Sequence, residues 1–322
     1  MNQSHCSLKC IFQSFYARAI ALLPLRSLAN PKNYSRWERK GIHITANDYY
    51  SPLPRFADLK EADWNREFAM QGIELRIDEQ MALLELFGRK FSAEYAGFAR
   101  TAAETTEEDY YLDNPFFSSV DAEIAYGMVR HFKPRKIIEV GSGFSTRLSA
   151  KALVQNEREG TARAELTAIE CYPGPLLKKG FPGLTRLLEQ RIEEVDLAFF
   201  ASLGENDILF IDSSHTVRFA GDVQFLFLEV LPILKPGVII HVHDIFFPFD
   251  YPKKWIIDDN LFWAEQYLLQ SFLTCNDSFQ VLWCGYMFHR KYPEKLAGVC
   301  ASYDPKSDLG AHPKSFWMKR SK

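Results

Sequence analysis

Short β-rich runs alternate with helical segments from residue 135 onward, and this alternation constrains the fold more than any other feature of the chain. The runs are RKIIEV (135–140), ELTAIE (165–170), DILFID (207–212) and GVIIHVHD (237–244). Helical segments are predicted to begin near Ser145, Pro175, Ala220 and Asp258. Such a succession of βαβ units predicts an α/β fold with a parallel sheet. The closing runs FQVLWCGYMF (279–288) and SFWMKR (315–320) predict an antiparallel pair at the sheet edge.

The N-terminal segment has apolar residues at helical spacing over residues 8–23, which predicts one amphipathic helix. Polar residues interrupt it and Arg18 lies within it, so we expect neither a membrane span nor a signal peptide. The favoured role is packing on its own domain or on a partner subunit, which leaves a homo-oligomer open. Contact with a membrane surface through residues 8–25 is the alternative, which Lys9, Arg18 and Arg26 would support.

The first 120 residues carry no motif that points to a substrate. Prolines and aromatic residues without clear periodicity predict an irregular covering segment over residues 30–60. Helices are predicted around residues 60–70, over 78–99 and over 120–132. The acidic run ETTEEDYYLDNPFF (104–117) is expected to form a surface loop.

Composition narrows the class of protein. With 322 residues and 47% hydrophobic content, the chain can bury a large core. A net charge of -3 and scattered Lys and Arg residues argue against a nucleic-acid partner. The six cysteines form no CxxC pair and no framework spacing, so neither a zinc site nor a disulfide scaffold is expected. Reduced thiols in a cytoplasmic protein fit this pattern best.

Polar residues stand at the ends of the predicted strands, where ligands bind in parallel sheets. They are Glu139 and Gly141 at the end of the RKIIEV run, Glu170 at the end of ELTAIE, Asp212 at the end of DILFID, and His243 and Asp244 at the end of GVIIHVHD. We therefore expect these side chains to share one ligand-binding edge.

The loop in KIIEVGSGFST (136–146) combines two glycines with hydroxyl side chains. Gly141 and Gly143 would let the backbone approach a ligand, and the helix that begins near Ser145 and Thr146 would point unpaired N–H groups at it. This arrangement indicates a nucleotide-like or anionic ligand, although a simple tight turn is the alternative.

Two acids favour a cationic ligand without phosphate. Glu170 could accept both hydroxyls of a ribose. Glu139 would repel a dinucleotide pyrophosphate, and Thr146 occupies the place of the third glycine in the dinucleotide fingerprint.

Four motifs in order carry a resemblance to a known family. EVGSGFST (139–146), AIECYPG (168–174), DILFIDSSH (207–215) and LPILKPGVIIHVHDIF (231–246) resemble the successive motifs of class I S-adenosylmethionine-dependent methyltransferases, especially the small-molecule O-methyltransferase-like branch. The resemblance implies a Rossmann-like domain with a mostly parallel seven-stranded sheet over residues 115–322, preceded by an accessory region over 1–114. EQYLLQSFL (265–273) and SFWMKR are similar to a group often associated with sugar or surface-polysaccharide pathways. The implied acceptor is a sugar or glycan hydroxyl.

The resemblance also implies which residues hold the cofactor, S-adenosylmethionine. It places Glu139 and the loop Gly141, Ser142 and Gly143 at the methionine moiety, and Glu170 at the ribose. It also implies contacts from Ser145 and Thr146 near the carboxylate of the cofactor, and a contact from Asp212. Glu193, after a third strand in RIEEV (191–195), stands where relatives place an adenine partner, although a solvated acid at a helix start is the favoured interpretation.

Methyl transfer to oxygen also requires removal of the acceptor's proton. Asp212 and His215 are the catalytic candidates, because a histidine three residues beyond a strand-end acid can reach the same pocket and has a suitable pKa. A divalent ion, Mg²⁺ or Mn²⁺, is the second possibility, held by Asp212, Asp244 and His243. Alternation along the strand would put His243 and Asp244 on opposite faces unless the strand has ended.

Two other classes of function share parts of this pattern. A protein that binds S-adenosylmethionine without turnover would keep the same cofactor residues. A nicotinamide-dependent oxidoreductase would share the sheet and Glu170, but it predicts a complete glycine fingerprint.

Overall fold

The computed structural model describes residues 18, 22, 28–60, 62–307 and 312–322. The chain divides into two compact units, Met1–Ala62 and Asp63–Lys322. The described part of the first unit contains the short helices η1 (Pro31–Asn33) and α3 (Tyr34–Glu38). The helix predicted over residues 8–23 lies outside the described residues, apart from Arg18 and Leu22. Within the described chain, no helix combines the length and apolarity needed to cross a membrane.

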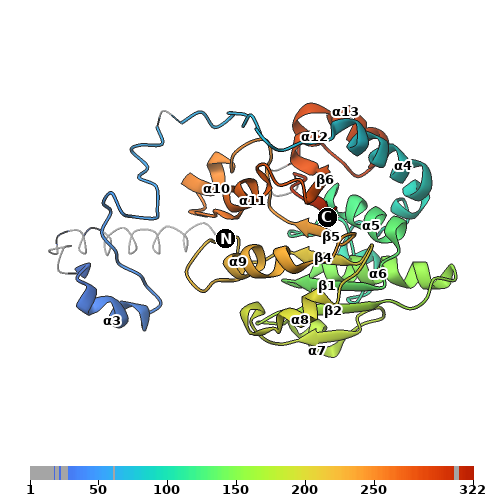
Figure 1. Ribbon diagram of the computed structural model, residues 1–322, viewed down its shortest axis with the longest axis horizontal. Helices are drawn as coiled ribbons and strands as arrows, with labels where there is room; N and C mark the ends of the chain where they lie inside the picture. Colours follow the sequence, from blue (N-terminus) through green and yellow to red (C-terminus); the bar gives the residue numbers. More distant parts are fainter. Residues whose placement is uncertain (1–17, 19–21, 23–27, 61, 308–311) are drawn as a thin grey trace, which may run out of the picture. The chain divides into compact units, whose positions relative to one another are not determined.

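The second unit is built around one seven-stranded sheet with the order β3-β2-β1-β4-β5-β7-β6 (Figure 1). The strands are β1 (Lys136–Val140), β2 (Glu165–Ile169), β3 (Arg186–Leu188), β4 (Ile208–Ile211), β5 (Ile239–Val242), β6 (Phe279–Cys284) and β7 (Phe316–Arg320). The first five pair in parallel, and β7 runs antiparallel to both β5 and β6. The predicted α/β fold with a mostly parallel sheet is confirmed.

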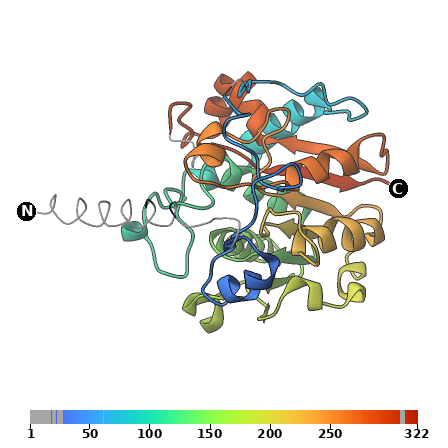
Figure 2. The ribbon, with the colours of Figure 1, turned by 90° about the vertical axis from the view of Figure 1, so that its left-hand side faces the viewer.

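Helices cover both faces of the sheet (Figures 1 and 2). On one face, α5 packs against α6, and α9 and α11 lie on the other (Figure 1). The helices are α4 (Ile77–Tyr95), α5 (Asp121–Phe132), α6 (Phe144–Arg158), α7 (Pro175–Lys179), α8 (Leu197–Ala201), α9 (Asp222–Phe225), α10 (Lys253–Ile257), α11 (Glu265–Leu273), α12 (Gly285–Lys291) and α13 (Pro293–Val299). Single turns are η2 (Ala102–Glu104), η3 (Ile192–Glu194), η4 (Leu226–Val230) and η5 (Leu231–Ile233).

Burial on both faces explains why the central strands are continuous apolar runs. Every residue of β4 and β5 is buried, including His241, because helices shield both sides of the sheet. The polar side chains that could reach a ligand therefore follow these two strands, in the loops at their carboxyl ends.

The predicted antiparallel pair at the sheet edge is confirmed, since β6 pairs with β7 there; within FQVLWCGYMF the first six residues form the strand and the rest opens α12. Two predicted helices are wrong. The stretch around residues 60–70 forms turns where it is described, and Phe68 donates its N–H to the carbonyl of Pro248 instead of to a helical partner. No helix begins near Asp258, since α10 ends at Ile257 and Asn260 has a φ of 55°, outside the helical region.

The predicted third strand is also displaced. RIEEV holds η3, and β3 lies a few residues earlier in the chain, at Arg186–Leu188. The predicted helix over 78–99 corresponds to α4, and the helix over 120–132 corresponds to α5.

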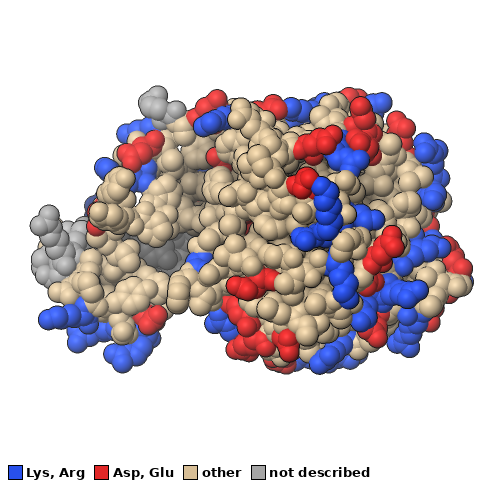
Figure 3. Space-filling model, viewed as in Figure 1, with Lys and Arg blue, Asp and Glu red and all other residues tan. Residues whose placement is uncertain are grey.

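Residues 63–114 belong to the same compact unit as the sheet, and the domain boundary expected after residue 114 stays a prediction. On the face shown in Figure 3, the charged side chains of this unit are of both signs and interspersed. Such a surface is consistent with the expected absence of a nucleic-acid partner, which also stays a prediction.

Candidate active site

The loop after β1 approaches the loop after β4 so closely that only glycine fits between them. Gly141 has a φ of 76°, and a Cβ added to it would lie 1.8 Å from the carbonyl oxygen of Asp212. The Gly141 N–H bonds to Ile169, and the Asp212 N–H bonds to Val140. Gly141 therefore allows the ends of β1, β2 and β4 to meet at one point.

A cavity of about 480 Å³ opens beside this glycine loop. Its volume lies within the range of roughly 300 to 1,000 Å³ that is usual for small-molecule sites. Six of the predicted cofactor residues line it: Gly141, Ser142, Gly143, Ser145, Glu170 and Asp212. The rest of the lining is mostly apolar and includes Phe116, Phe117, Phe144, Leu176, Leu177 and Phe181. The cavity thus offers both polar groups and flat or branched apolar groups to a ligand.

Glu170 is held at the cavity wall by two backbone donors. Its Oε2 accepts a hydrogen bond from the Ser142 N–H at 3.2 Å, and its Oε1 accepts one from the Tyr172 N–H at 2.8 Å. The carboxylate is therefore oriented before any ligand enters.

Glu139 lies behind the loop and does not line the cavity. Its Oε1 accepts hydrogen bonds from Ser145 Oγ at 2.6 Å and Thr146 Oγ1 at 3.1 Å, and Thr146 Oγ1 in turn accepts one from the Gly143 N–H at 2.9 Å. Burial raises the pKa of Glu139 to about 8, although both hydroxyls act against this shift. Here Glu139 and Thr146 brace the glycine loop; the ligand contacts expected of them stay predictions.

Glu193 also lies away from the cavity lining. It belongs to η3, and its Oε1 pairs with the Arg191 guanidinium at 2.7 Å. An adenine contact from this residue stays a prediction.

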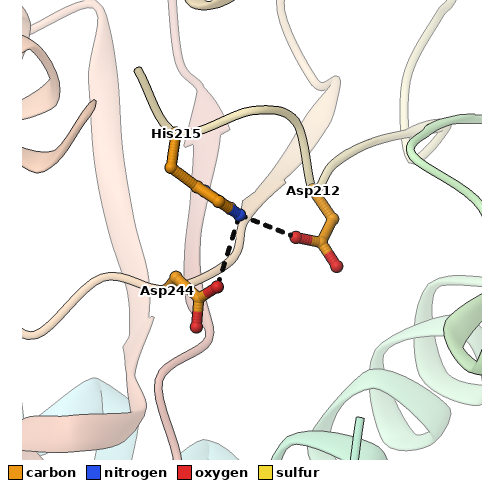
Figure 4. A group of neighbouring side chains, drawn as sticks. All are labelled: Asp212, His215 and Asp244. Carbon is orange, nitrogen blue, oxygen red and sulfur yellow. Dashed lines mark ion pairs between the residues drawn. The ribbon is translucent and has the colours of Figure 1, made fainter. Parts of the chain in front are cut away.

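Beyond Asp212 lies a cluster of charged side chains in which Asp212, His215 and Asp244 point toward one another (Figure 4). His215 Nε2 is 3.2 Å from Asp212 Oδ1 and 3.3 Å from Asp244 Oδ2. The strand β5 ends at Val242, and Asp244 has a φ of 57°. This turn brings Asp244 into the cluster, which is the exception that the alternation argument had left open.

His243 contacts the other oxygens of the same two acids. Its Nδ1 is 3.6 Å from Asp212 Oδ2 and 3.8 Å from Asp244 Oδ1, and the Lys314 ammonium is 2.9 Å from that same Asp244 Oδ1. Two imidazoles and one ammonium therefore surround two carboxylates.

Each imidazole is backed by a second acid that the sequence did not indicate. Glu265 Oε2 is 2.7 Å from His215 Nδ1, and Asp121 Oδ2 is 3.4 Å from His243 Nε2. Both acids are the first residue of a helix, α11 and α5, where the helix dipole favours a negative charge. An acid at the start of a predicted helix is the one sequence signal that could have indicated Glu265 and Asp121. No sequence signal indicated Lys314, which precedes β7.

Comparisons with known proteins agree with this geometry. The chain is 30% identical over 168 residues to an uncharacterized protein of Archaeoglobus fulgidus, an alignment that covers 50% of this chain and 73% of the relative. Residues 138–245, which hold the glycine loop, Glu170, Asp212 and Asp244, match a family model described as a methyltransferase domain. The chain belongs to the class I S-adenosylmethionine-dependent methyltransferase family.

Solved structures resemble the methyltransferase only weakly. The apo structure of CmcI-N160 is 13% identical, with a TM-score of 0.37 over 86% of this chain and 100% of that one. The plantazolicin methyltransferase BamL, in complex with a triazolic analogue and S-adenosylhomocysteine, is 11% identical, with a TM-score of 0.35 over 77% of this chain and 100% of its own. Likenesses at this level are too weak to assign residues.

The charges in the methyltransferase cluster stabilise one another. Burial acts to lower the pKa of His215, but its hydrogen bonds with Asp212 and Glu265 and the nearby Asp244 outweigh burial and raise it. Burial also acts to lower the pKa of His243, but the nearby carboxylates of Asp244, Asp212 and Asp121 outweigh it and raise the pKa to about 9. The pKa of Asp212 is lowered well below its usual value, because both imidazoles oppose the effect of its burial.

The donor set of the cluster suits a divalent cation. One atom each from Asp212, His215 and Asp244 lies within 4.8 Å of the others, so His215 completes this group and the role of His243 as a ligand stays a prediction. The two carboxylate oxygens suit Mg²⁺ or Mn²⁺, and an imidazole nitrogen is a ligand that transition-metal ions accept. A neutral His215 would aim a lone pair at two oxygens, so a cation, either a proton or a metal ion, is required between them.

Proposed function

We propose that this methyltransferase moves the methyl group of S-adenosylmethionine to a hydroxyl oxygen of a small polar acceptor. The observation that carries the proposal is the double position of Asp212. Its carboxylate lines the cavity and also contacts His215 and His243. A methyl donor in the cavity would therefore lie next to the groups that can take up a proton.

The cavity suits the donor in three respects. Glu170 presents an oriented carboxylate to which ribose hydroxyls could donate. Gly143 keeps the backbone open, because a Cβ there would meet no atom within 4 Å. Phe116, Phe144 and the leucines of α7 form apolar walls against which an adenine ring could pack.

The reaction would be an in-line displacement. The acceptor oxygen forms a bond to the methyl carbon while the bond from that carbon to sulfur breaks, which leaves S-adenosylhomocysteine. Without an ion, the proton of the hydroxyl passes to Nε2 of a neutral His215 and from there to water. When bound by Asp212, His215 and Asp244, a divalent ion would lower the pKa of the acceptor hydroxyl, whose proton would then pass to water.

The resemblance of the EQYLLQSFL and SFWMKR runs to proteins of sugar and surface-polysaccharide pathways favours a sugar or glycan hydroxyl as acceptor. Methylation of a nitrogen is the second candidate for the acceptor atom, and assays of amino sugars beside neutral sugars distinguish the two.

The donor is tested by calorimetry of the full chain with S-adenosylmethionine and, separately, with NAD. We expect binding of S-adenosylmethionine that Glu170→Ala weakens by about 1 to 3 kcal/mol, the usual effect of removing a charged hydrogen-bond partner. Glu229→Ala, which changes an exposed acid on η4, is the matched control and should bind as the wild type does. Binding of NAD without binding of S-adenosylmethionine would contradict the proposal.

The acceptor is tested by transfer of a labelled methyl group to a panel of monosaccharides, oligosaccharides and amino sugars. Labelled product from one class identifies the acceptor. Tight binding of S-adenosylmethionine without any transfer across the panel would support a non-catalytic binding protein.

A further inference from the structure

Helix α11 begins with a buried acid that the proposed function has not used. Glu265 is 1% exposed and is the first residue of the EQYLLQSFL run. Its carboxylate does not line the cavity beside the glycine loop. A buried carboxylate is unfavourable unless it is bonded, so its partners indicate what it does.

Among the residues that the structure describes, the carboxylate of Glu265 has its partners in one loop. Its Oε2 is 2.7 Å from His215 Nδ1, and its Oε1 accepts a weaker bond from Ser213 Oγ at 3.4 Å. Asp121, the acid behind His243, differs because it also accepts hydrogen bonds from the backbone N–H groups of Lys314 and Ser315. Asp121 therefore also fixes the start of β7, whereas Glu265 serves only the loop after β4.

The residues around Glu265 hold His215 on two more sides. The ring of Trp263 packs on the imidazole with a centroid distance of 4.3 Å. The N–H groups of Ala264 and Glu265 donate to the His215 carbonyl at 3.0 and 3.2 Å. His215 has a φ of 57°, an unfavourable conformation for a residue with a Cβ, so it depends on such contacts.

We propose that Glu265 is the positioning residue of His215: its carboxylate accepts a hydrogen bond from the Nδ1–H group and thereby directs Nε2 toward Asp212 and Asp244. This role deepens the proposed function and rests on it for its importance to catalysis. The geometry is that of a ligating or basic histidine whose second nitrogen is fixed by a carboxylate. Without Glu265, the imidazole ring could rotate about the Cβ–Cγ bond, and Nε2 would no longer point toward the two acids.

Nitrogen-15 NMR of histidine side chains tests this in the full chain without any ligand. The His215 resonances are identified by their loss in His215→Ala. We expect a Nδ1 proton resonance shifted downfield by the carboxylate. Glu265→Met, which keeps the volume but removes both oxygens, should abolish that shift, and Glu265→Gln should reduce it, because an amide oxygen is a weaker acceptor.

Gln266→Leu is the matched control. Gln266 is the next residue of the same helix, is equally buried, and bonds to Phe246 and Phe249 instead of to His215. This variant should leave the His215 resonance in place. An unchanged resonance in Glu265→Gln would overturn the proposal even if Glu265→Met fails to fold.

A second readout is the affinity for Mn²⁺ alone, measured by electron paramagnetic resonance of the free ion. Glu265→Met should weaken Mn²⁺ binding by about 10- to 100-fold, the usual effect of losing the carboxylate behind a ligating histidine. In the His215→Ala background the same change should have no further effect, because Glu265 acts through His215. An equal loss in both backgrounds would overturn the proposal. If the wild type binds no Mn²⁺, the metal part of the proposed function fails, while the NMR comparison still decides the role of Glu265.

Discussion

The cavity beside β1 and the charged cluster beyond Asp212 are built from different materials. The cavity is formed by glycine backbone, apolar side chains and one acid, Glu170, that backbone N–H groups fix in place. The cluster is formed by charged side chains that pair with one another. A site of the first kind recognises a ligand by its shape. In a site of the second kind, the paired charges can bind a cation or take up and release a proton.

Within the cluster, the two imidazoles show the same contrast on a smaller scale. His215 lies on a loop, and α11 holds it by hydrogen bonds. His243 follows directly after β5, and its ring packs on Phe117 at 5.2 Å and on His241 at 5.7 Å. His243 is therefore part of the core, while His215 is a side chain presented by the core.

The largest effect should come from removing a metal ion from the cluster. If Asp212, His215 and Asp244 hold a divalent ion, EDTA should abolish methyl transfer, and Mg²⁺ or Mn²⁺ should restore it. Binding of S-adenosylmethionine by calorimetry should persist, although the shared Asp212 can change its affinity, because Glu170 and the glycine loop do not belong to the ion's ligand set. Full activity in EDTA would mean that a base alone removes the proton.

Next in size is the difference between the two histidines. His215→Ala should lower kcat by roughly a hundredfold, the usual contribution of a general base, and should also lower stability, because the buried Glu265 carboxylate loses its nearest partner. His243→Ala should destabilise the fold by about 1 to 3 kcal/mol with a smaller loss of kcat, since it opens a cavity in the core and leaves Asp121 with one partner fewer. Urea denaturation and steady-state kinetics of both variants make the comparison. Equal losses of activity at equal stability would remove the distinction.

On the cavity side, the two glycines of the loop should respond differently to the same change. Gly141→Ala should destabilise the protein by about 2 to 5 kcal/mol, because it adds a strained φ and a collision with the Asp212 carbonyl. Gly143→Ala, where a Cβ meets no atom within 4 Å, should keep the stability of the wild type. Thermal unfolding tests this pair, and equal midpoints would show that the loop after β1 adapts to a side chain.

The smallest effect concerns Glu139 and pH. Its pKa in the folded protein, about 8, lies above the ordinary value of 4.5, so the folded state holds a proton that the unfolded state releases between these two values. This contribution to stability is complete below about pH 4.5 and is lost as pH rises toward 8, by at most about 1.4 kcal/mol per pH unit.

Glu139→Gln should remove this dependence. The free energy of unfolding of the variant, compared with the wild type by urea denaturation at several pH values, should rise relative to the wild type between pH 5 and pH 8. A constant difference between the two proteins would show that Glu139 is ionised in the fold.

The cavity could be predicted from sequence because its residues are close together along the chain or end neighbouring strands. Gly141, Glu170 and Asp212 follow three strands that the apolar runs already indicate, and parallel pairing brings the ends of these strands to one edge of the sheet. Glu139 was harder, because nothing in EVGSGFST tells whether Ser145 and Thr146 face the ligand or the acid behind it.

The outer part of the cluster could not be predicted in the same way. Glu265 and Lys314 reach it from elements far along the chain, and their positions depend on how α11 and β7 pack. The predicted helices around residues 60–70 and near Asp258 are wrong for a related reason. Tertiary contacts, not local periodicity, determine the left-handed conformation of Asn260 and the hydrogen bond of Phe68.

The carboxylate of Asp212 belongs to both halves of the site, and this has a thermodynamic consequence. If a ligand in the cavity interacts with Asp212 differently when the cluster holds its own ligand, each ligand must change the affinity for the other by the same factor. The shared carboxylate thus gives the two halves a route for favourable or unfavourable coupling. Affinities for the methyl donor measured with and without the ion would give the size and sign of that coupling directly.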